Sequence, residues 1–303
     1  MKRLFSIPLL IVFLFSLSAC GGQRAQKDLS GVTIATSTYP IYLFTKSLTE
    51  GIEGVEVTQL IDETISCLHD YTLTVPDMKA IETADIIILN GADLEVFMED
   101  ALARTDAVII DCSQGVDLLP ADGHEHHHHE EDDHHHGHYD PHYWLSEEAG
   151  PVMLDNILHG LTQLDESHAD AYHENYAAAA KQFVANRFDA SSLSCPYLIT
   201  FHDGFRYLVH ENGLTLLKSI EEEEGSTASA ADIKEIVALI REYNIPAIFT
   251  ERYGSDKTAQ TIARETGVKV YRLDMLMSGE GQDISAYFEA LNANYAIIRE
   301  ALS

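Results

Sequence analysis

The chain has 303 residues, of which 46% are hydrophobic, and this is enough for a sizeable core in two domains or lobes. It carries 49 acidic against 19 basic residues, a formal net charge of −30. This charge excludes nucleic acid and an anionic membrane surface as electrostatic partners. It is compatible with a cationic ligand, and equally with acidity that keeps an exported protein soluble.

The N-terminus has the pattern of a processing segment, and we interpret residues 1–19 as a signal peptide. A positive start, MKR, precedes an apolar run over residues 4–17, which is shorter than the roughly 20 residues that span a bilayer. The run closes on LSACG (residues 17–21), which resembles the lipobox of bacterial lipoproteins. We therefore expect Cys20 to carry a lipid that anchors the chain to the bacterial cell membrane, with residues 20–30 as a polar tether. Plain secretion is the alternative.

Three further cysteines, Cys67, Cys112 and Cys195, follow in the remainder of the chain. An exported protein can form disulfides, but three thiols cannot all pair within one chain. Cys67–Cys112 is one candidate bridge, and a buried free thiol is expected for a cysteine left over. No CxxC spacing occurs, so a thiolate metal site is not expected.

Strand and helix patterns alternate through residues 31–145. Short, apolar and nearly continuous strands of this kind are typical of parallel strands covered on both faces, and they predict an N-terminal α/β lobe. The expected strands are residues 31–37, 55–61, 85–91 and 107–113, and the expected helices are residues 41–48, 75–84 and 93–104.

A low-complexity segment, residues 121–138, closes this lobe and holds nine histidines and five acidic residues between positions 124 and 138. Such a composition cannot bury a core, so we predict a solvated loop. The segment is internal and interrupted by carboxylates, unlike a purification tag. Its histidines are His124, His126, His127, His128, His129, His134, His135, His136 and His138.

A helical connector, residues 146–190, and a second α/β lobe, residues 191–303, are expected after this loop. The connector has the composition of one or two long helices. Ligand clefts in such proteins lie beyond the carboxyl ends of strands and between lobes. The strands expected in the second lobe are residues 196–201, 214–220, 247–251 and 268–274, and its helices are residues 204–211, 231–243, 257–265 and 285–302.

Four polar residues lie where a cleft between the lobes is expected. His69 follows the second strand, His142 closes the first lobe, His202 follows strand 196–201, and Asp274 ends strand 268–274. Position alone does not separate a metal site from ordinary surface or core histidines, since a lone histidine is more often one of the latter.

Four segments carry a resemblance to a known family, the zinc- and manganese-specific solute-binding proteins of bacterial ABC importers. The resemblance covers residues 30–303. In the first segment the family pattern is Pro-His-x-Tyr/Phe-Glu-Pro, whereas this chain has Leu68 for the first proline and Thr72-Leu73 for Glu-Pro. The segments are LHDYTLTVPDMKAIETADIIILNGADLEVFME (68–99), YDPHYWLS (139–146), TFHDGFRYL (200–208) and IFTERYGSDKTAQTIARETGVKVYRLD (248–274).

The resemblance implies that His69, His142 and His202 are metal ligands. The fourth position varies in the family between aspartate, glutamate and water, and Asp274 is our first choice with Glu251 the second. Three imidazoles with a carboxylate or water suit tetrahedral Zn²⁺. Mn²⁺ prefers more oxygen donors, so zinc is favoured over manganese.

Two aspartates next to ligand histidines, Asp140 and Asp203, are candidates for orienting the imidazoles, and they are equally suited to capping turns. Two interpretations also remain for the histidine-rich loop. It is either a low-affinity zinc collector, as is common at this position in zinc-specific members, or a tolerated insertion. A collector would hold zinc at neutral pH and release it in mild acid, because free imidazole has a pKa near 6.5.

The resemblance implies a monomeric, lipid-anchored extracytoplasmic protein, without enzymatic activity, that delivers Zn²⁺ to an ABC permease and its ATPase. Two alternatives from other classes stay open. A zinc hydrolase also uses three histidines with an open fourth position. A manganese-binding or adhesin lipoprotein with a structural metal is the other.

Overall fold

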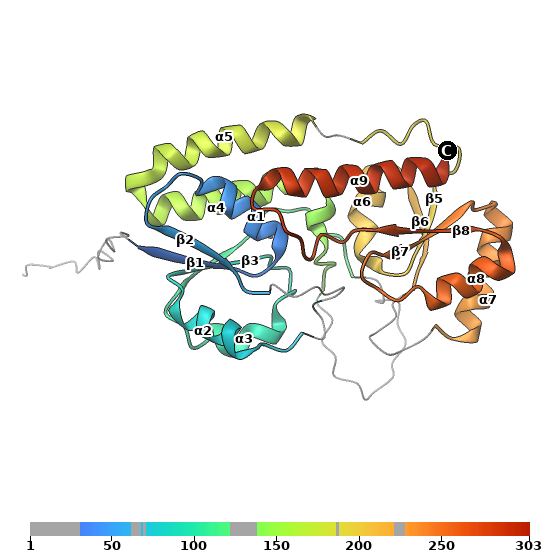
Figure 1. The fold of residues 1–303 in the computed structure, drawn as a ribbon, viewed down its shortest axis with the longest axis horizontal. Helices are drawn as coiled ribbons and strands as arrows, with labels where there is room; N and C mark the ends of the chain where they lie inside the picture. The colour runs from blue at the N-terminus through green and yellow to red at the C-terminus, as the bar shows by residue number, and fades with distance from the viewer. Residues whose placement is uncertain (1–30, 62–67, 69–70, 122–137, 186–187, 221–227) are drawn as a thin grey trace, which may run out of the picture.

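The computed structural model describes residues 31–61, 68, 71–121, 138–185, 188–220 and 228–303. In these ranges the chain forms two α/β lobes, each built on a parallel sheet (Figure 1). The predicted α/β fold with two lobes and parallel sheets is therefore confirmed. The expectations for the signal peptide, the histidines at positions 124–136 and three single residues, Cys20, Cys67 and His69, lie outside the described residues.

The first lobe has the strand order β2-β1-β3-β4, with each pair parallel. Its strands are β1 (Val32–Thr36), β2 (Val55–Gln59), β3 (Ile86–Leu89) and β4 (Val108–Asp111). Its helical elements are α1 (Tyr39–Leu48), α2 (Val75–Thr83), the 3-10 turn η1 (Val96–Met98) and α3 (Glu99–Leu102). The helix expected over residues 93–104 is shorter than predicted. Gly91, Ala92 and Asp93 all have positive φ, and this left-handed backbone delays the helix start.

The second lobe has the strand order β6-β5-β7-β8, again all parallel. Its strands are β5 (Tyr197–Thr200), β6 (Thr215–Ser219), β7 (Ala247–Glu251) and β8 (Lys269–Leu273). Its helical elements are the 3-10 turn η4 (Asp203–Phe205), α6 (Arg206–Glu211), α7 (Ala230–Tyr243) and α8 (Lys257–Thr266). The central strand β7 is buried along its whole length, which agrees with its apolar composition.

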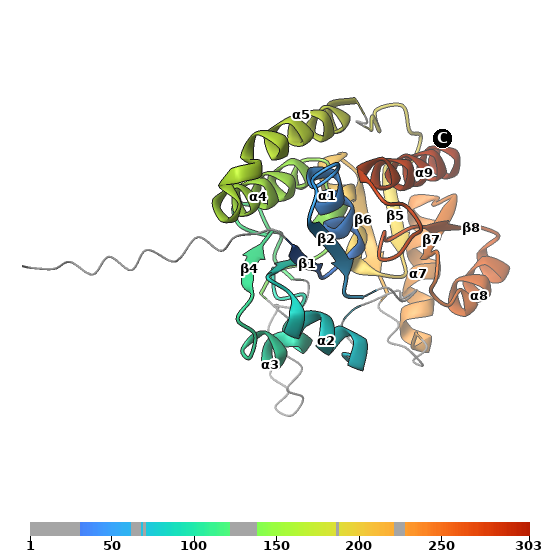
Figure 2. The same cartoon turned by 60° about the vertical axis from the view of Figure 1, so that its left-hand side comes forward.

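The remaining helices cover one side of both lobes. They are α4 (Ala149–Leu164), α5 (Ala169–Ala185) and α9 (Ile284–Leu302), with the 3-10 turn η3 (Glu166–His168) between α4 and α5. Another 3-10 turn, η2 (Tyr143–Leu145), precedes α4. The expected connector is thus two helices, α4 and α5, which pack on each other and on α1 (Figures 1 and 2). Helix α9 begins beside α1 and runs along the second lobe to the C-terminus.

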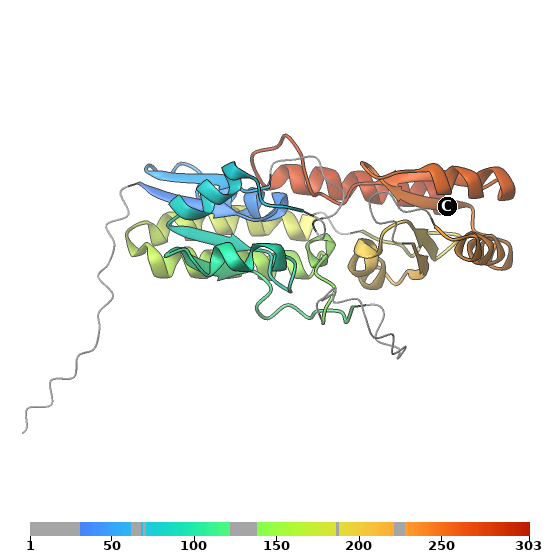
Figure 3. The same ribbon diagram turned by 90° about the horizontal axis from the view of Figure 1, so that it is seen from below.

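The lobes lie side by side (Figure 3). Hydrogen bonds of buried residues join them. The Trp144 indole donates to the Met275 carbonyl at 2.8 Å, and the Tyr287 hydroxyl donates to the Trp144 carbonyl at 2.6 Å. The Ile284 amide donates to the Ser47 hydroxyl of α1 at 2.8 Å. The η2 turn is therefore held by residues of the second lobe at the place where the lobes meet.

Two cysteines are described, and both are free thiols. Cys112 is fully buried at the end of β4, where burial raises the pKa of its thiol well above the ordinary range. Cys195 is half-buried before β5. Among the described residues, none of the helices combines the length and apolar character that a membrane crossing requires.

Candidate metal centre

His142 lies at the start of the η2 turn and is held there by Asp140. Oδ1 of Asp140 accepts from the His142 backbone amide at 2.9 Å and lies 2.8 Å from Nδ1 of the imidazole. Both residues are buried, with 2% of Asp140 and 3% of His142 exposed. A carboxylate only accepts hydrogen bonds, so Nδ1 donates and Nε2 is left as the nitrogen for a metal.

His202 lies directly after β5 and caps the η4 turn. Its Nδ1 accepts from the Gly204 amide at 2.9 Å, and the Thr200 hydroxyl donates to its carbonyl at 2.7 Å. A Cβ atom at position 204 would lie 2.2 Å from the Met275 methyl and 3.1 Å from Cδ2 of His142. The glycine therefore lets this turn approach the first lobe closely.

The two imidazoles converge from different lobes. Their ring centroids are 4.9 Å apart and the rings are perpendicular. Donor atoms of His142, His202 and Asp203 all lie within 4.8 Å of one another, and Oε1 of Glu251 lies 3.7 Å from Nε2 of His202. Glu251 is near because β7 pairs directly with β5, so the ends of these two strands are neighbours. Nitrogen and carboxylate donors at this spacing form a set that suits Zn²⁺.

The charges around the imidazoles favour a cation. Burial alone would lower the pKa of His142, but the hydrogen bond and charge of Asp140, with the charges of Asp203 and Glu251, raise it above its ordinary value. Burial raises the pKa of Glu251 to about 8, against a smaller lowering by His142. The buried Oε2 of Glu251 has no hydrogen-bond partner among the described residues, so this oxygen can serve as a donor to a metal.

Asp274, the first choice for a fourth ligand, lies at the end of β8 and already has partners for both oxygens. Oδ1 accepts from the Leu276 amide at 2.8 Å and Oδ2 accepts from the Arg252 guanidinium at 2.7 Å. It does not belong to the described group whose donor atoms lie within 4.8 Å of one another. The assignment of Asp274 as a ligand stays a prediction.

Two acidic residues that the sequence ranked below Asp274 lie close to the histidines. Asp203 brings a carboxylate oxygen to 3.3 Å from Nδ1 of His202 and belongs to the converging group. Glu251, our second choice as fourth ligand, is 6% exposed and faces His202 from the adjacent strand. The signal that could have ranked Glu251 higher is the order of the strands, which the sequence does not state.

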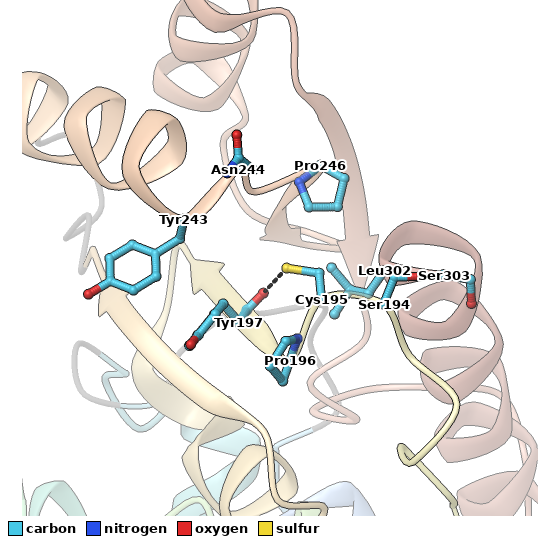
Figure 4. Close-up of a pocket in the computed structure, with 9 residues that line it drawn as sticks. All are labelled: Ser194, Cys195, Pro196, Tyr197, Tyr243, Asn244, Pro246, Leu302 and Ser303. Carbon is cyan, nitrogen blue, oxygen red and sulfur yellow. Dashed lines mark hydrogen bonds between the residues drawn. The ribbon is translucent and has the colours of Figure 1, made fainter.

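A separate cavity lies at the opposite end of β5. It has a volume of about 280 Å³ and is lined by the chain before β5, the end of α7 and the C-terminus (Figure 4). Cys195 contributes the one sulfur, which donates to the Tyr197 carbonyl at 3.8 Å (Figure 4). Among the described residues that line it there is no histidine or carboxylate side chain, so it lacks the donor types that converge between the lobes.

A buried imidazole pair with carboxylates, at the meeting of two α/β lobes, defines a two-lobe binding protein for a small cation. The comparison with protein families agrees with this class. The family model described as zinc-uptake complex component A, periplasmic (ZnuA), matches residues 34–301. The chain belongs to this family, and the resemblance found in the sequence is confirmed.

Similar proteins include binders of more than one metal. The chain is 30% identical to the high-affinity zinc uptake system protein ZnuA of Bacillus subtilis, over 94% of this chain and 93% of that protein. It is 26% identical to the iron-binding protein YfeA of Yersinia pestis, over 82% and 80% of the two chains. The crystal structure of the laminin-binding protein Lbp of Streptococcus pyogenes matches with a TM-score of 0.73 and 26% identity, over 90% of this chain and all of that chain.

Proposed function

We propose that this chain is an extracytoplasmic protein that captures Zn²⁺ between its lobes and delivers it to an ABC permease and its ATPase. The observation that carries the proposal is the approach of two buried imidazoles, one from each lobe, to 4.9 Å between ring centroids. Buried imidazoles with carboxylates are donors that suit zinc. Membership of the zinc-uptake family and 30% identity to a zinc uptake protein also support it.

The ligand set that we propose is His69, His142 and His202 with one carboxylate. Glu251 and Asp274 compete for the fourth position, and the 3.7 Å separation from His202 supports Glu251. A set rich in imidazole favours Zn²⁺ over Mn²⁺, which prefers oxygen donors. The similarity to an iron-binding protein makes Fe²⁺ the metal to include in competition experiments.

The metal is cargo in this proposal, and the protein has no enzymatic activity of its own. We propose that lipidation of Cys20 holds the monomeric chain at the cell membrane, so that zinc is released beside the permease. The LSACG segment at residues 17–21 supports the lipid anchor. Mass spectrometry of the protein from membranes tests it, and a Cys20→Ala variant recovered in the membrane fraction would contradict it.

The histidine-rich segment, in this proposal, collects zinc with low affinity and raises its concentration near the lobes. Its nine histidines support several weak sites, and such sites lose metal as their imidazoles take up protons below about pH 6.5. The residues on either side of positions 122–137 are paired with each other, which offers a clean way to remove the segment. The Ala121 amide donates to the His138 carbonyl at 3.2 Å, so Asn-Gly in place of residues 122–137 joins the two ends as a tight hairpin.

The test is a zinc titration of this shortened protein against a competing chelator. Trp144 is the one tryptophan of the chain, and its ring centroid lies 5.2 Å from that of His142, so its fluorescence reports occupancy. We expect one site of submicromolar affinity. His142→Ala and His202→Ala should each weaken it by more than the roughly 10–100-fold that loss of a residue behind a ligand costs.

His159→Ala is the matched control, since His159 is an exposed histidine of α4 that contacts Gln163. It should leave the affinity unchanged. Submicromolar zinc binding that survives alanine at His69, His142 and His202 together would show that the site is elsewhere. Tighter binding of Mn²⁺ or Fe²⁺ than of Zn²⁺ in the same titration would overturn the choice of metal.

A further inference from the structure

The stem of the histidine-rich segment is a short antiparallel pairing. Pro120 and Tyr139 form a β-bridge, and the Asp140 amide donates to the Leu119 carbonyl at 2.9 Å. Asp140 therefore has two roles in the described chain. Its backbone closes the stem, and its side chain holds Nδ1 of His142 at 2.8 Å.

The first turn of α6, from the second lobe, forms hydrogen bonds with this stem. The Arg206 guanidinium donates to the Pro120 carbonyl at 2.7 Å and lies 3.5 Å from Oδ2 of Asp140. The Tyr207 hydroxyl donates to the Asp140 carbonyl at 2.7 Å and accepts from the Leu119 amide at 2.9 Å. Both strands of the stem are thus bonded to two consecutive residues of the other lobe.

Arg206 is the charged partner of the buried Asp140 carboxylate in this contact. The Asp140 side chain is 1% exposed, and a buried carboxylate is unfavourable without a charged partner. Arg206 lies against Oδ2 and leaves Oδ1 to the imidazole and amide of His142. A carboxylate held in this way keeps the proton of His142 on Nδ1 and leaves Nε2 for the metal.

We infer that Arg206 is a positioning residue for His142, acting through Asp140 across the two lobes. Arg206 comes four positions after His202, so one segment of the second lobe supplies a metal-binding imidazole and also orients the imidazole of the first lobe. The inference rests on the proposed function, because it requires His142 to bind the zinc.

The test compares Arg206→Met and Arg206→Lys in the full chain, with zinc affinity read from the fluorescence of Trp144. Arg206→Met removes the charge while keeping an unbranched side chain, and we expect it to weaken zinc binding by about 10-fold or more. Arg206→Lys keeps a point charge and should recover most of the loss. The control is Arg241→Met, which removes an exposed pair with Glu265 and should leave the affinity unchanged.

A double-mutant cycle with Asp140→Asn separates positioning from general damage. If Arg206 acts through Asp140, Arg206→Met should add little to the loss that Asp140→Asn causes alone. Long-range ¹H–¹⁵N spectra of the metal-free protein should show the His142 proton on Nδ1, and a mixture of tautomers in Arg206→Met. Fully additive losses, or an Arg206→Met affinity within twofold of the parent, would overturn the inference.

The melting temperatures of the metal-free variants show whether a loss of zinc affinity comes from a loss of stability. A loss of affinity that follows the melting temperature in both Arg206→Met and Arg206→Lys would assign Arg206 a structural role and contradict the inference. His142→Ala distinguishes the two proposals. If it leaves zinc binding intact the proposed site fails, whereas if it abolishes binding and Arg206→Met does not weaken it, the positioning role alone fails.

Discussion

At the scale of single residues, Glu95 is a buried acid that holds the backbone of Asn90 and Gly91, close to the segment that carries His142. Its Oε1 accepts from the Asn90 amide at 2.8 Å and its Oε2 accepts from the Gly91 amide at 3.0 Å. The Asn90 side chain in turn donates to the Pro141 carbonyl at 3.1 Å, next to His142. Burial raises the pKa of Glu95 to about 7, although the bonds from Ser37 and from these amides lower it.

This shift predicts a pH dependence of stability. The pKa of Glu95 is higher in the folded chain than the ordinary 4.5, so its contribution is present in full below about pH 4.5 and is lost as the pH rises through about 7. The free energy of unfolding of the parent, relative to Glu95→Gln, should fall by about 2–3 kcal/mol between about pH 5 and pH 8. Urea unfolding with a chelator present measures it. Parallel pH profiles for the two proteins would rule out this titration.

At the scale of elements, the start of α2 shows how a local motif fixes where a helix begins. Asp77 accepts from the Thr74 amide at 2.7 Å and from the Tyr71 hydroxyl at 2.8 Å, and Thr74 caps the Asp77 amide in return. This capping box gives α2 a defined beginning just after the predicted ligand His69. Asp77 is buried, so its bonds have little competition from water.

Asp77→Ala should therefore destabilise the protein by about 1–2 kcal/mol, the upper part of the range for a lost cap. Urea unfolding of the metal-free chain is the measurement. The matched control is Asp232→Ala, which breaks the exposed capping box that Ser229 and Asp232 form at α7, and it should cost less. An equal or larger loss of unfolding free energy in Asp232→Ala would contradict the idea that burial strengthens the capping box of α2.

At the scale of the whole molecule, the contacts between the lobes favour a stiff protein. Trp144 is fully buried, and its indole and its backbone carbonyl bond to Met275 and Tyr287, respectively. Glu211 of α6 accepts from the Glu147 amide at 2.8 Å, close to the start of α4. Opening the lobes would break these hydrogen bonds and expose the buried Trp144 indole to water, which is costly.

We therefore expect little lobe movement when zinc binds. The radius of gyration from small-angle X-ray scattering should change by less than about 1 Å between the chelator-treated and zinc-loaded forms of the shortened protein. Trp144→Phe, which removes the indole donor to Met275, should allow a larger difference. A clear contraction of the parent on zinc addition would show that the contacts between the lobes open in solution.

Much of the architecture was predictable because it depends on local pattern. Alternating short apolar strands and helices were sufficient for two parallel α/β lobes, since strands buried on both faces need continuous apolar runs. The motifs around His142 and His202 were recognisable in the chain itself. The left-handed residues Ala92 and Asp93, which shorten the helix expected after β3, were not predictable because a non-glycine residue seldom has positive φ.

The sequence by itself determined the fold class, the family and the two imidazoles that the structure brings together, because these depend on periodicity and on contiguous motifs. Asp140 and Asp203 were candidates because they lie near these histidines in the chain, whereas the tertiary structure alone decided that Glu251 faces His202. The order β6-β5-β7-β8 places the end of β7, and so Glu251, beside His202, with β8 and Asp274 one strand farther away. The contact between Arg206 and Asp140, 66 residues apart, likewise exists only because the lobes meet. Such neighbours come from packing over long separations, which local pattern does not encode.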